Sequence, residues 1–294
     1  MRIETKLKKV ALISVILGSL CAIAVSGCIG KTEPEQLVVF AGASDVAIGT
    51  ARVPLNIQLI NGARFDDRAD ELEVTYTSPT KNETYVVDDL TWRAWPVRSG
   101  TYTSTMTFDE VGLWSIKVRA KSNNHSISAG SGILVKSATE APNIGDLAPL
   151  TATKTKPSDG NLRSITSATD PDPDLYSVSF ENAVASGNPT VITFSTPAYC
   201  QSATCGPQTD VLSALDDVYK GKASFIHVEI FDNPEQMLAT GDPTVGIEAS
   251  VIHEWNFHTE PWTFVVDGNG IVIGRFESFA TQTEIEEYLV PILN

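Results

Sequence analysis

The sequence predicts two folded parts of different classes, an all-β part followed by an α/β part. The chain has 294 residues, which is enough for two domains that each bury a core. Residues 37–137 contain short alternating or β-branched stretches separated by turn residues every 8–12 residues or so, with no helical period. From Asn188 onward, strand-like stretches alternate with helical patterns.

Composition and charge exclude several kinds of partner and scaffold. The chain carries 21 Lys and Arg against 36 Asp and Glu, a net charge of −15, and has no basic cluster beyond its first ten residues. This charge would repel a phosphate backbone, so we expect no nucleic-acid partner. Four cysteines are too few for a disulfide-stapled scaffold or a four-thiolate metal site.

The N-terminus has the layout of an export signal. Basic residues precede an uncharged stretch from Val10 to Val25, which ends in Val25-Ser26-Gly27-Cys28. That ending resembles the lipobox of bacterial lipoproteins, which implies a signal peptide over residues 1–27, lipidation of Cys28 and a tether over residues 28–36. A transmembrane anchor or an ordinary secretory signal are the alternatives. We therefore expect a chain attached to the membrane by a lipid anchor, at the outer face of the cytoplasmic membrane or in the periplasm.

The all-β part is predicted to be an antiparallel sandwich over residues 37–137. The expected strands are Val53–Ile60, Leu72–Thr77, Thr84–Trp92, Tyr102–Phe108, Leu113–Val118 and Ile127–Val135. The stretch from Phe108 to Val118 resembles a strand entry that is common in immunoglobulin-like and fibronectin type III-like modules. Trp92 and Trp95 are expected in the core, with a carbohydrate-stacking platform as the alternative.

The next segment, residues 138–177, is predicted to be a linker or wrapping segment, because it is rich in Pro, Asp, Ser and Thr and lacks periodicity. The α/β part should then occupy residues 178–294 in the order β-α-β-(α)-β-β-α. Its expected elements are strands Pro189–Ser195 and Ala223–Ile230, helix Pro207–Tyr219, a short helix around Val245–Trp255, a hairpin turning at Asp267-Gly268-Asn269-Gly270, and a helix from Gln282 to Val290 that opens on a capping box.

Three motifs of the α/β part occur in the order found in thioredoxin-like proteins. The stretch Tyr199-Cys200-Gln201-Ser202-Ala203-Thr204-Cys205-Gly206-Pro207 lies between the first strand and the first long helix, where that fold has its active-site loop. Glu260-Pro261-Trp262 resembles the segment in which a cis-proline opens the third core strand of thioredoxins and TlpA-like proteins. Gly145-Asp146-Leu147-Ala148-Pro149 is similar to the entry of TlpA-like and redoxin domains, so the resemblance begins near residue 145.

The spacing of the two cysteines departs from the family pattern, since four residues separate them instead of two. Residues five apart on one helix are about 7.5 Å apart along its axis, which is too far for a disulfide, so Cys200 and Cys205 cannot both be helical. We therefore expect Pro207 at the first helical position, Gly206 as the cap and Cys205 just outside the helix. Chain order makes Cys200 the attacking thiol, whereas alignment with the thioredoxin loop makes it Cys205. Both remain open.

Three functions fit the pair. The family resemblance implies a thiol–disulfide oxidoreductase acting on protein thiols, with Cys200 and Cys205 catalytic and with Gly206, Pro207, Glu260 and Pro261 positioning the substrate. A structural disulfide in a non-enzymatic binding module needs only the two cysteines and export. A Sco-like copper protein would use Cys200, Cys205 and His258; otherwise no cofactor or metal is expected.

The remaining polar candidates have weaker signals. His227 alternates within an apolar strand and should face solvent or a core hydrogen bond, and His253 is expected in a packed loop. Glu260 would lie near the dithiol, where it is either a proton shuttle or an exposed carboxylate.

Overall fold

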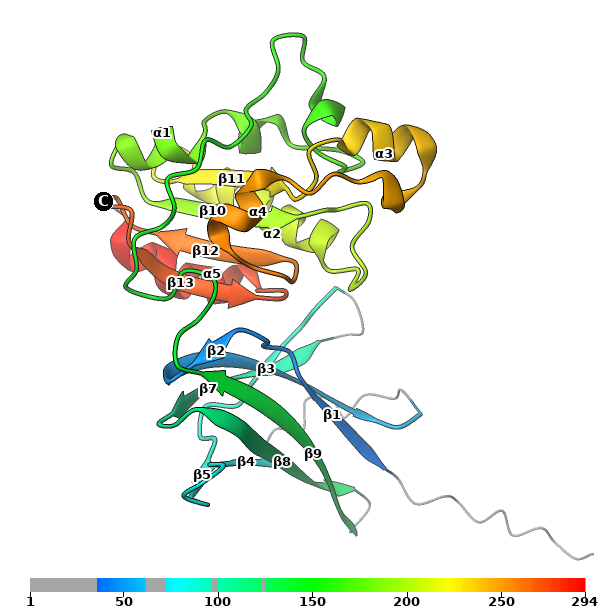
Figure 1. Ribbon diagram of the computed structural model, residues 1–294, viewed down its shortest axis with the longest axis vertical. Coiled ribbons are helices and arrows are strands. Elements are labelled where there is room, and N and C mark those ends of the chain that lie inside the picture. The colour runs from blue at the N-terminus through cyan, green and yellow to red at the C-terminus, as the bar shows by residue number, and fades with distance from the viewer. Residues whose placement is uncertain (1–35, 62–71, 97–99, 123–124, 294) are drawn as a thin grey trace, which may run out of the picture. The chain divides into compact units, whose positions relative to one another are not determined.

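The computed structural model describes residues 36–61, 72–96, 100–122 and 125–293 (Figure 1). The expected signal peptide, the lipidation at Cys28 and nearly all of the tether lie outside these residues. Within the described part of the chain, no helix is both long and apolar enough to cross a membrane.

Two sheets make up the N-terminal part. The first contains, in spatial order, β1 (Leu37–Ala41), β3 (Gly49–Leu59), β7 (Thr101–Phe108) and β6 (Thr91–Arg93). The second contains β2 (Val46–Ala47), β9 (His125–Lys136), β8 (Gly112–Ser122), β4 (Leu72–Thr77) and β5 (Thr84–Val86). All neighbours are antiparallel except β2 and β9.

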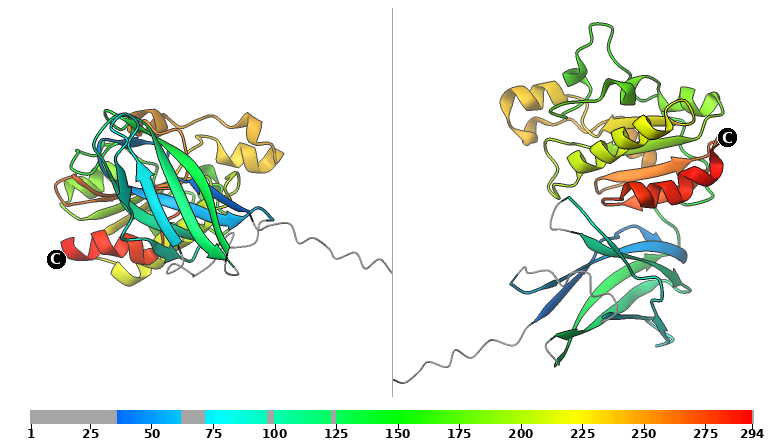
Figure 2. Two further views of the ribbon diagram at one scale, coloured as in Figure 1. Left: turned by 90° about the horizontal axis from the view of Figure 1, so that it is seen from below. Right: turned by 180° about the vertical axis from the view of Figure 1, so that it is seen from behind.

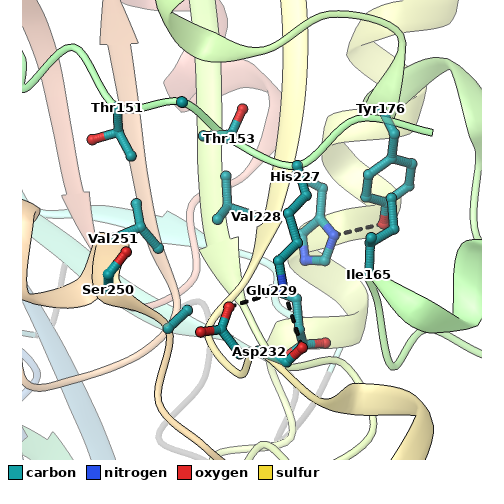
Figure 3. Close-up of a pocket in the computed structure, with 13 residues that line it drawn as sticks. Thr151, Thr153, Ile165, Tyr176, His227, Val228, Glu229, Asp232, Ser250 and Val251 are labelled. Atoms are coloured by element: carbon teal, nitrogen blue, oxygen red, sulfur yellow. Dashed lines mark hydrogen bonds and ion pairs between the residues drawn. The ribbon is translucent and has the colours of Figure 1, made fainter. Parts of the chain in front are cut away.

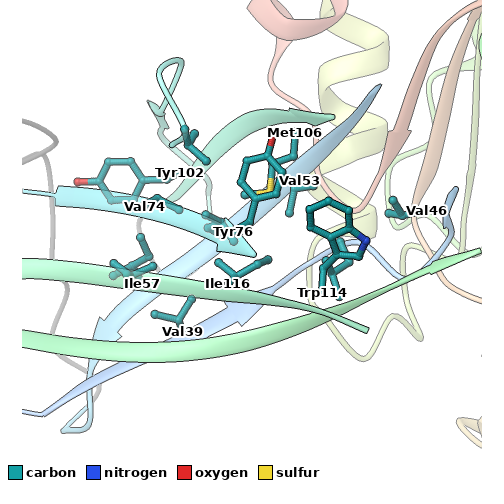
Figure 4. Close-up of a cluster of buried hydrophobic side chains, with 14 of the residues drawn as sticks. Val39, Val46, Val53, Ile57, Val74, Tyr76, Tyr102, Met106, Trp114 and Ile116 are labelled. Atoms are coloured by element: carbon teal, nitrogen blue, oxygen red, sulfur yellow. The ribbon is translucent and has the colours of Figure 1, made fainter. Parts of the chain in front are cut away.

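The two sheets share one hydrophobic core and therefore form a β-sandwich (Figure 4). Leu55 and Tyr102 from the first sheet and Trp114 and Ile116 from the second are completely buried. Alternate residues of each strand enter this core, as the period of two in a strand requires. Trp92 packs edge-on against Tyr102, with ring centroids 4.9 Å apart, which confirms that this side chain belongs to the core.

A third sheet follows the sandwich. Its strands are, in spatial order, β11 (Ser224–Glu229), β10 (Thr190–Ser195), β12 (Trp262–Val266) and β13 (Val272–Glu277). Strands β10 and β11 are parallel, whereas β12 is antiparallel to both β10 and β13. The α-helices are α1 (Phe180–Ala185), α2 (Cys205–Tyr219), α3 (Pro234–Thr240), α4 (Ser250–Trp255) and α5 (Gln282–Leu289). Short 3-10 helices cover Leu162–Ser164, Pro173–Tyr176, Pro243–Val245 and Val290–Ile292.

Helices cover both faces of the third sheet. Helix α4 lies in front of it in Figure 1, whereas α2 and α5 lie in front when the molecule is seen from behind (Figure 2). Neighbouring strand residues alternate accordingly: Ile192 packs with α1 and α4, and Val191 packs with α2 and α5. Because both faces are covered, every residue of β10 is buried, and so are the polar side chains at its carboxyl end.

The order of elements in the α/β part follows the sequence prediction, with differences in extent. The DGNG turn joins β12 to β13, and Thr281 and Glu284 form the predicted capping box of α5. Helices α1 and α3 and strands β1 and β2 were not predicted, and the expected strand Thr84–Trp92 is divided into β5 and β6.

The wrapping segment is attached to the third sheet, since the Gly145 N–H donates to the Val272 carbonyl and the Ala148 N–H donates to the Gly270 carbonyl.

Two arginines join the strands of the sandwich to the third sheet and α5. Arg52 of β3 donates to Glu284 Oε1 at 2.9 Å and to the carbonyls of Glu277 and Phe279 at 3.0 and 2.9 Å. Arg275 of β13 donates to the Pro142 carbonyl and to the carbonyl and carboxylate of Asp45. These guanidinium groups satisfy backbone carbonyls and carboxylates together, which a hydrophobic contact cannot do.

Candidate active site

A disulfide joins Cys200 and Cys205 in the connection between β10 and α2, with their Cα atoms 5.8 Å apart. Cys205 is the first residue of α2 and is completely buried, whereas Cys200 lies in the preceding loop and is half-buried. As expected, the two cysteines are not both helical. One sulfur is therefore shielded from solvent, and the other belongs to a residue that reaches the surface.

The start of α2 differs from the expectation by two residues. Thr204 is the N-cap, Cys205 occupies the first position, and Gly206 and Pro207 occupy the second and third. Proline is tolerated there because none of the first four N–H groups of a helix has a partner within the helix. The prediction that Gly206 caps the helix and that Cys205 lies outside it is therefore wrong.

One of these free N–H groups is directed at the disulfide. The backbone N–H of Cys205 donates to Cys200 Sγ at 3.3 Å, and Ser202 Oγ lies 3.1 Å from the same sulfur. Hydrogen bonding and the positive end of the helix dipole both favour a thiolate over a thiol. Cys200 is thus the sulfur that the helix start stabilises.

Glu260 also lies close to the disulfide, and Pro261 follows it. The peptide bond between them is cis, as predicted. Ligand atoms of Cys200, Cys205 and Glu260 all lie within 4.8 Å of one another. Glu260 Oε2 accepts a hydrogen bond from the Thr196 N–H at 3.2 Å. The pKa of Glu260 is raised to about 7, mainly by burial; the Thr196 hydrogen bond lowers it and the nearby Glu229 adds to the increase.

A chain of polar side chains runs beneath the disulfide, on α2 and the strands. Thr209 Oγ1 donates to the Cys205 carbonyl at 3.0 Å and lies 3.2 Å from Ser195 Oγ, which is 2.9 Å from His227 Nε2. His227 Nδ1 lies 2.7 Å from the Tyr176 hydroxyl. Burial lowers the pKa of His227 to about 4, so its ring is neutral near pH 7. Of the two expectations for His227, the core hydrogen bond is confirmed.

A small cavity of about 80 Å³ lies next to this chain, between β11, the 151–154 segment and the start of α4. In Figure 3, Tyr176 and His227 lie on one side of it, and Thr151, Ser250 and Val251 on the other. Glu229 also lines the cavity and is 5% exposed. Its Oε2 accepts the Ser167 N–H at 2.8 Å, and burial raises its pKa. Sequence reasoning missed Glu229, although a carboxylate at the end of an apolar strand was a usable signal.

A larger groove of about 260 Å³ begins at Glu260, and neither cysteine lines it. Its lining consists of Ile230, Phe231, Glu248, Ile252, Phe257, His258, Thr259 and Glu260. Ile252 and Phe257 are buried, while the side chains of Glu248 and His258 are largely exposed. The groove therefore combines buried apolar residues with an exposed polar rim.

His258, the histidine of the copper alternative, and the neighbouring His253 both pair with carboxylates. His258 Nε2 lies 3.0 Å from Glu140 Oε2, and the His258 side chain is 73% exposed. His253 Nε2 lies 3.8 Å from Glu248. Among the described residues, the group of three or more side chains close enough to share a metal ion consists of Cys200, Cys205 and Glu260. The structure thus brings Glu260, and not His258, together with the two sulfurs.

Comparison with known proteins yields distant structural likenesses. No protein-family model and no curated protein matches the chain. A crystal structure from Chlorobium tepidum, assigned as a thiol:disulfide interchange protein DsbE, is 15% identical and covers 52% of this chain and 100% of its own, with a TM-score of 0.37. The PKD domain of human KIAA0319 is 17% identical and covers 41% of this chain and 98% of its own, with a TM-score of 0.23. An immunoglobulin domain complex of titin M10 and obscurin-like 1 is 12% identical and covers 35% and 95%, with a TM-score of 0.21. At these identities and scores, the likenesses show neither a family nor a function for this chain.

Proposed function

We propose that the chain is a thiol–disulfide oxidoreductase that acts on protein thiols through Cys200 and Cys205. The observation that carries the proposal is the position of the disulfide at the start of α2, where one cysteine is half-buried in a loop and the other is completely buried. Disulfide exchange needs an accessible, stabilised thiolate and a second thiol that reaches only its partner. A disulfide that served structure alone would need neither the asymmetry in exposure nor an N–H directed at one sulfur.

Exchange begins on the reduced protein at Cys200. Its thiolate attacks one sulfur of a substrate disulfide, a bond forms between the two sulfurs, and the second substrate sulfur leaves as a thiolate. The Cys205 N–H, which lies 3.3 Å from Cys200 Sγ, stabilises the attacking thiolate. Cys205 is completely buried and cannot meet a protein substrate.

Resolution of the mixed disulfide belongs to Cys205. The departing substrate thiolate takes a proton from water, the Cys205 thiol loses its proton to water, and the resulting Cys205 thiolate attacks Cys200 Sγ. The bond between Cys200 and the substrate breaks, and the sulfur that was bound to Cys200 leaves as a thiolate that takes a proton from water. The substrate disulfide is reduced to two thiols, and the protein dithiol is oxidised to the Cys200–Cys205 disulfide. The same steps in reverse oxidise a substrate dithiol.

Residues around the disulfide would hold the substrate chain in place. We assign this positioning role to Gly206 and Pro207 on the α2 side and to Glu260 and Pro261 on the β12 side. The groove supports the assignment, because it offers apolar surface beside Glu260, a residue with a carboxylate oxygen within 4.8 Å of both sulfurs.

The proposal includes the fold and the place of the protein. The sheet order β11-β10-β12-β13 with helices on both faces supports a thioredoxin-like domain, and the shared core of the first two sheets supports an immunoglobulin-like sandwich before it. The sequence up to Cys28 supports a lipoprotein held outside the cytoplasm, where its two remaining cysteines can be oxidised.

Insulin reduction in the presence of dithiothreitol tests the activity. We expect the wild-type chain to accelerate insulin precipitation, and Cys200→Ser or Cys205→Ser to reduce the rate to that of dithiothreitol alone. Far-UV circular dichroism and thermal unfolding under reducing conditions show whether the variants remain folded. Unchanged rates in two folded variants would contradict the proposal.

A further inference from the structure

We infer that the reduced protein binds a divalent cation such as Zn²⁺ through Cys200 Sγ, Cys205 Sγ and a carboxylate oxygen of Glu260. The inference rests on one part of the proposed function, namely that the Cys200–Cys205 disulfide can be reduced to two thiols. It concerns a different property of the same residues, namely metal binding without a substrate.

The donor atoms are already gathered. The two sulfurs and a Glu260 oxygen lie within 4.8 Å of one another in the oxidised protein. Around a zinc ion with Zn–S bonds of about 2.3 Å, two thiolates stand roughly 3.8 Å apart. Reduction frees the sulfurs to separate, and the change can be confined to the loop residue Cys200, since Cys205 is fixed in the first turn of α2.

Hydrogen bonds already hold these donors in place, as they do around metal ligands in proteins. The Cys205 N–H and the Ser202 hydroxyl contact Cys200 Sγ at 3.3 and 3.1 Å. The Thr196 N–H donates to Glu260 Oε2 at 3.2 Å, which orients that carboxylate. Each of the two movable ligands, Cys200 and Glu260, is therefore held by a hydrogen bond from a group that does not itself bind the metal.

The donor set selects the class of metal. Two thiolates and one carboxylate suit a borderline cation such as Zn²⁺, with water in the fourth position. Cuprous ion prefers sulfur and gains little from a carboxylate. Magnesium and calcium prefer oxygen ligands. Entry is open on the side of Cys200, which is half-buried, and along the groove that begins at Glu260.

Binding has a defined chemical balance. The two thiols lose their protons to the solvent, the metal gains two thiolate bonds and one carboxylate bond, and no electron is transferred. Neither sulfur is then free to attack a disulfide, so bound zinc should stop exchange until a chelator removes it.

The test measures metal binding to the reduced full-length chain in the absence of oxygen. Zn²⁺ affinity is determined by competition with a chromogenic chelator, and Co²⁺ replaces Zn²⁺ to report thiolate ligation and tetrahedral geometry by its absorption spectrum. We expect one ion per chain, sulfur-to-cobalt charge transfer, and no binding by the oxidised protein. Glu260→Gln should weaken Zn²⁺ binding at least roughly tenfold but leave cuprous ion affinity unchanged.

Matched variants separate a carboxylate ligand from a general loss of surface charge and from a folding defect. Glu248→Gln removes an exposed carboxylate from the same groove and should bind Zn²⁺ like the wild type. Glu260→Asp keeps the carboxylate and should bind Zn²⁺ more tightly than Glu260→Gln. A folding defect caused by any change at Glu260 would weaken Zn²⁺ binding in both variants. Equal Zn²⁺ affinity for the wild type and Glu260→Gln would overturn the three-residue site, and so would the absence of a one-to-one complex.

Failure of the two proposals can be told apart. Exchange is assayed in the presence of chelator, and metal binding is assayed without substrate. If the protein catalyses exchange but its Zn²⁺ affinity does not depend on Glu260, the metal site alone is overturned. If it forms a zinc complex that depends on Glu260 but does not catalyse exchange, the oxidoreductase alone is overturned.

Discussion

The backbone N–H of Cys205 donates to Cys200 Sγ at 3.3 Å, so the first residue of α2 stabilises the sulfur of its own disulfide partner. In the proposed exchange, this contact and the burial of Cys205 assign different roles to the two cysteines. Chain order and alignment with the thioredoxin loop disagree about which thiol attacks. The structure favours Cys200, because it is both the accessible and the stabilised sulfur.

This assignment predicts which single variant traps a substrate. Cys205→Ser should accumulate a mixed disulfide between Cys200 and the substrate, because the resolving thiol is missing. Cys200→Ser should trap none, because buried Cys205 cannot reach a protein substrate. Both should lose roughly a thousandfold or more in turnover. Non-reducing gels and mass spectrometry detect the adduct, and an adduct formed by Cys200→Ser in place of Cys205→Ser would reverse the roles.

His227 should make the protein less stable in mild acid. Its pKa is lowered to about 4 in the folded state, against about 6.5 in the unfolded chain, so the unfolded state binds the proton first as the pH falls. The stabilisation is fully present above pH 6.5 and is lost as the pH falls towards 4. The free energy of unfolding should decrease by about 3 kcal/mol over that range from this residue alone.

Urea unfolding at several pH values measures this effect. The difference in unfolding free energy between the wild type and His227→Gln should shrink as the pH falls from 6.5 to 4, because only the wild type carries the titrating ring. His253→Gln is the matched control, since the His253 side chain is 74% exposed. A His227→Gln difference that stays constant with pH would show that the ring titrates normally.

Truncation of Arg52 should be costly. Its side chain is 14% exposed, and its partner Glu284 is 4% exposed. Arg52→Ala would remove the donor that lies 2.9 Å from Glu284 Oε1 and the donor to two backbone carbonyls, and would leave Glu284 with the Thr281 hydrogen bonds to Oε2 and with Arg93 at 3.9 Å. This loss should cost about 2–4 kcal/mol in unfolding free energy. Thermal or urea unfolding measures the loss.

The control for Arg52 is Arg119, whose pair with Glu73 is half exposed on both sides. Arg119→Ala should change stability by about 0–1 kcal/mol. Similar losses for the two variants would mean that the contacts of Arg52 with Glu284, Glu277 and Phe279 contribute little.

Local patterns predicted much of the α/β part. The spacing of Val211, Leu212 and Leu215 indicated α2, and the Thr281 to Glu284 pattern fixed the start of α5. Helices α1 and α3 have only six and seven residues, too few to show a helical period. The helix begins two residues before Pro207, at Cys205, whose N–H donates to Cys200 Sγ; a prediction that placed Pro207 first did not consider that partner.

The composition of the site was only partly predictable. Local motifs indicated Cys200, Cys205 and Pro261. Glu229 accepts the Ser167 N–H from 62 residues away in the sequence and lies close enough to Glu260 to raise its pKa, so only the folded chain shows its place in the site. Glu260 lies beside the sulfurs, whereas His258, two residues earlier in the chain, does not belong to that group. His258 is held on the surface by Glu140, a partner more than 100 residues away.

The reduction potential of the Cys200–Cys205 pair tests the central claim most directly. It is measured by equilibrating the chain in glutathione or dithiothreitol redox buffers and trapping free thiols with a mass-shifting alkylating reagent. An exchange-active pair should lie between about −120 and −270 mV, the range of thiol–disulfide exchange proteins. A value below about −300 mV would mark a structural disulfide and contradict the oxidoreductase.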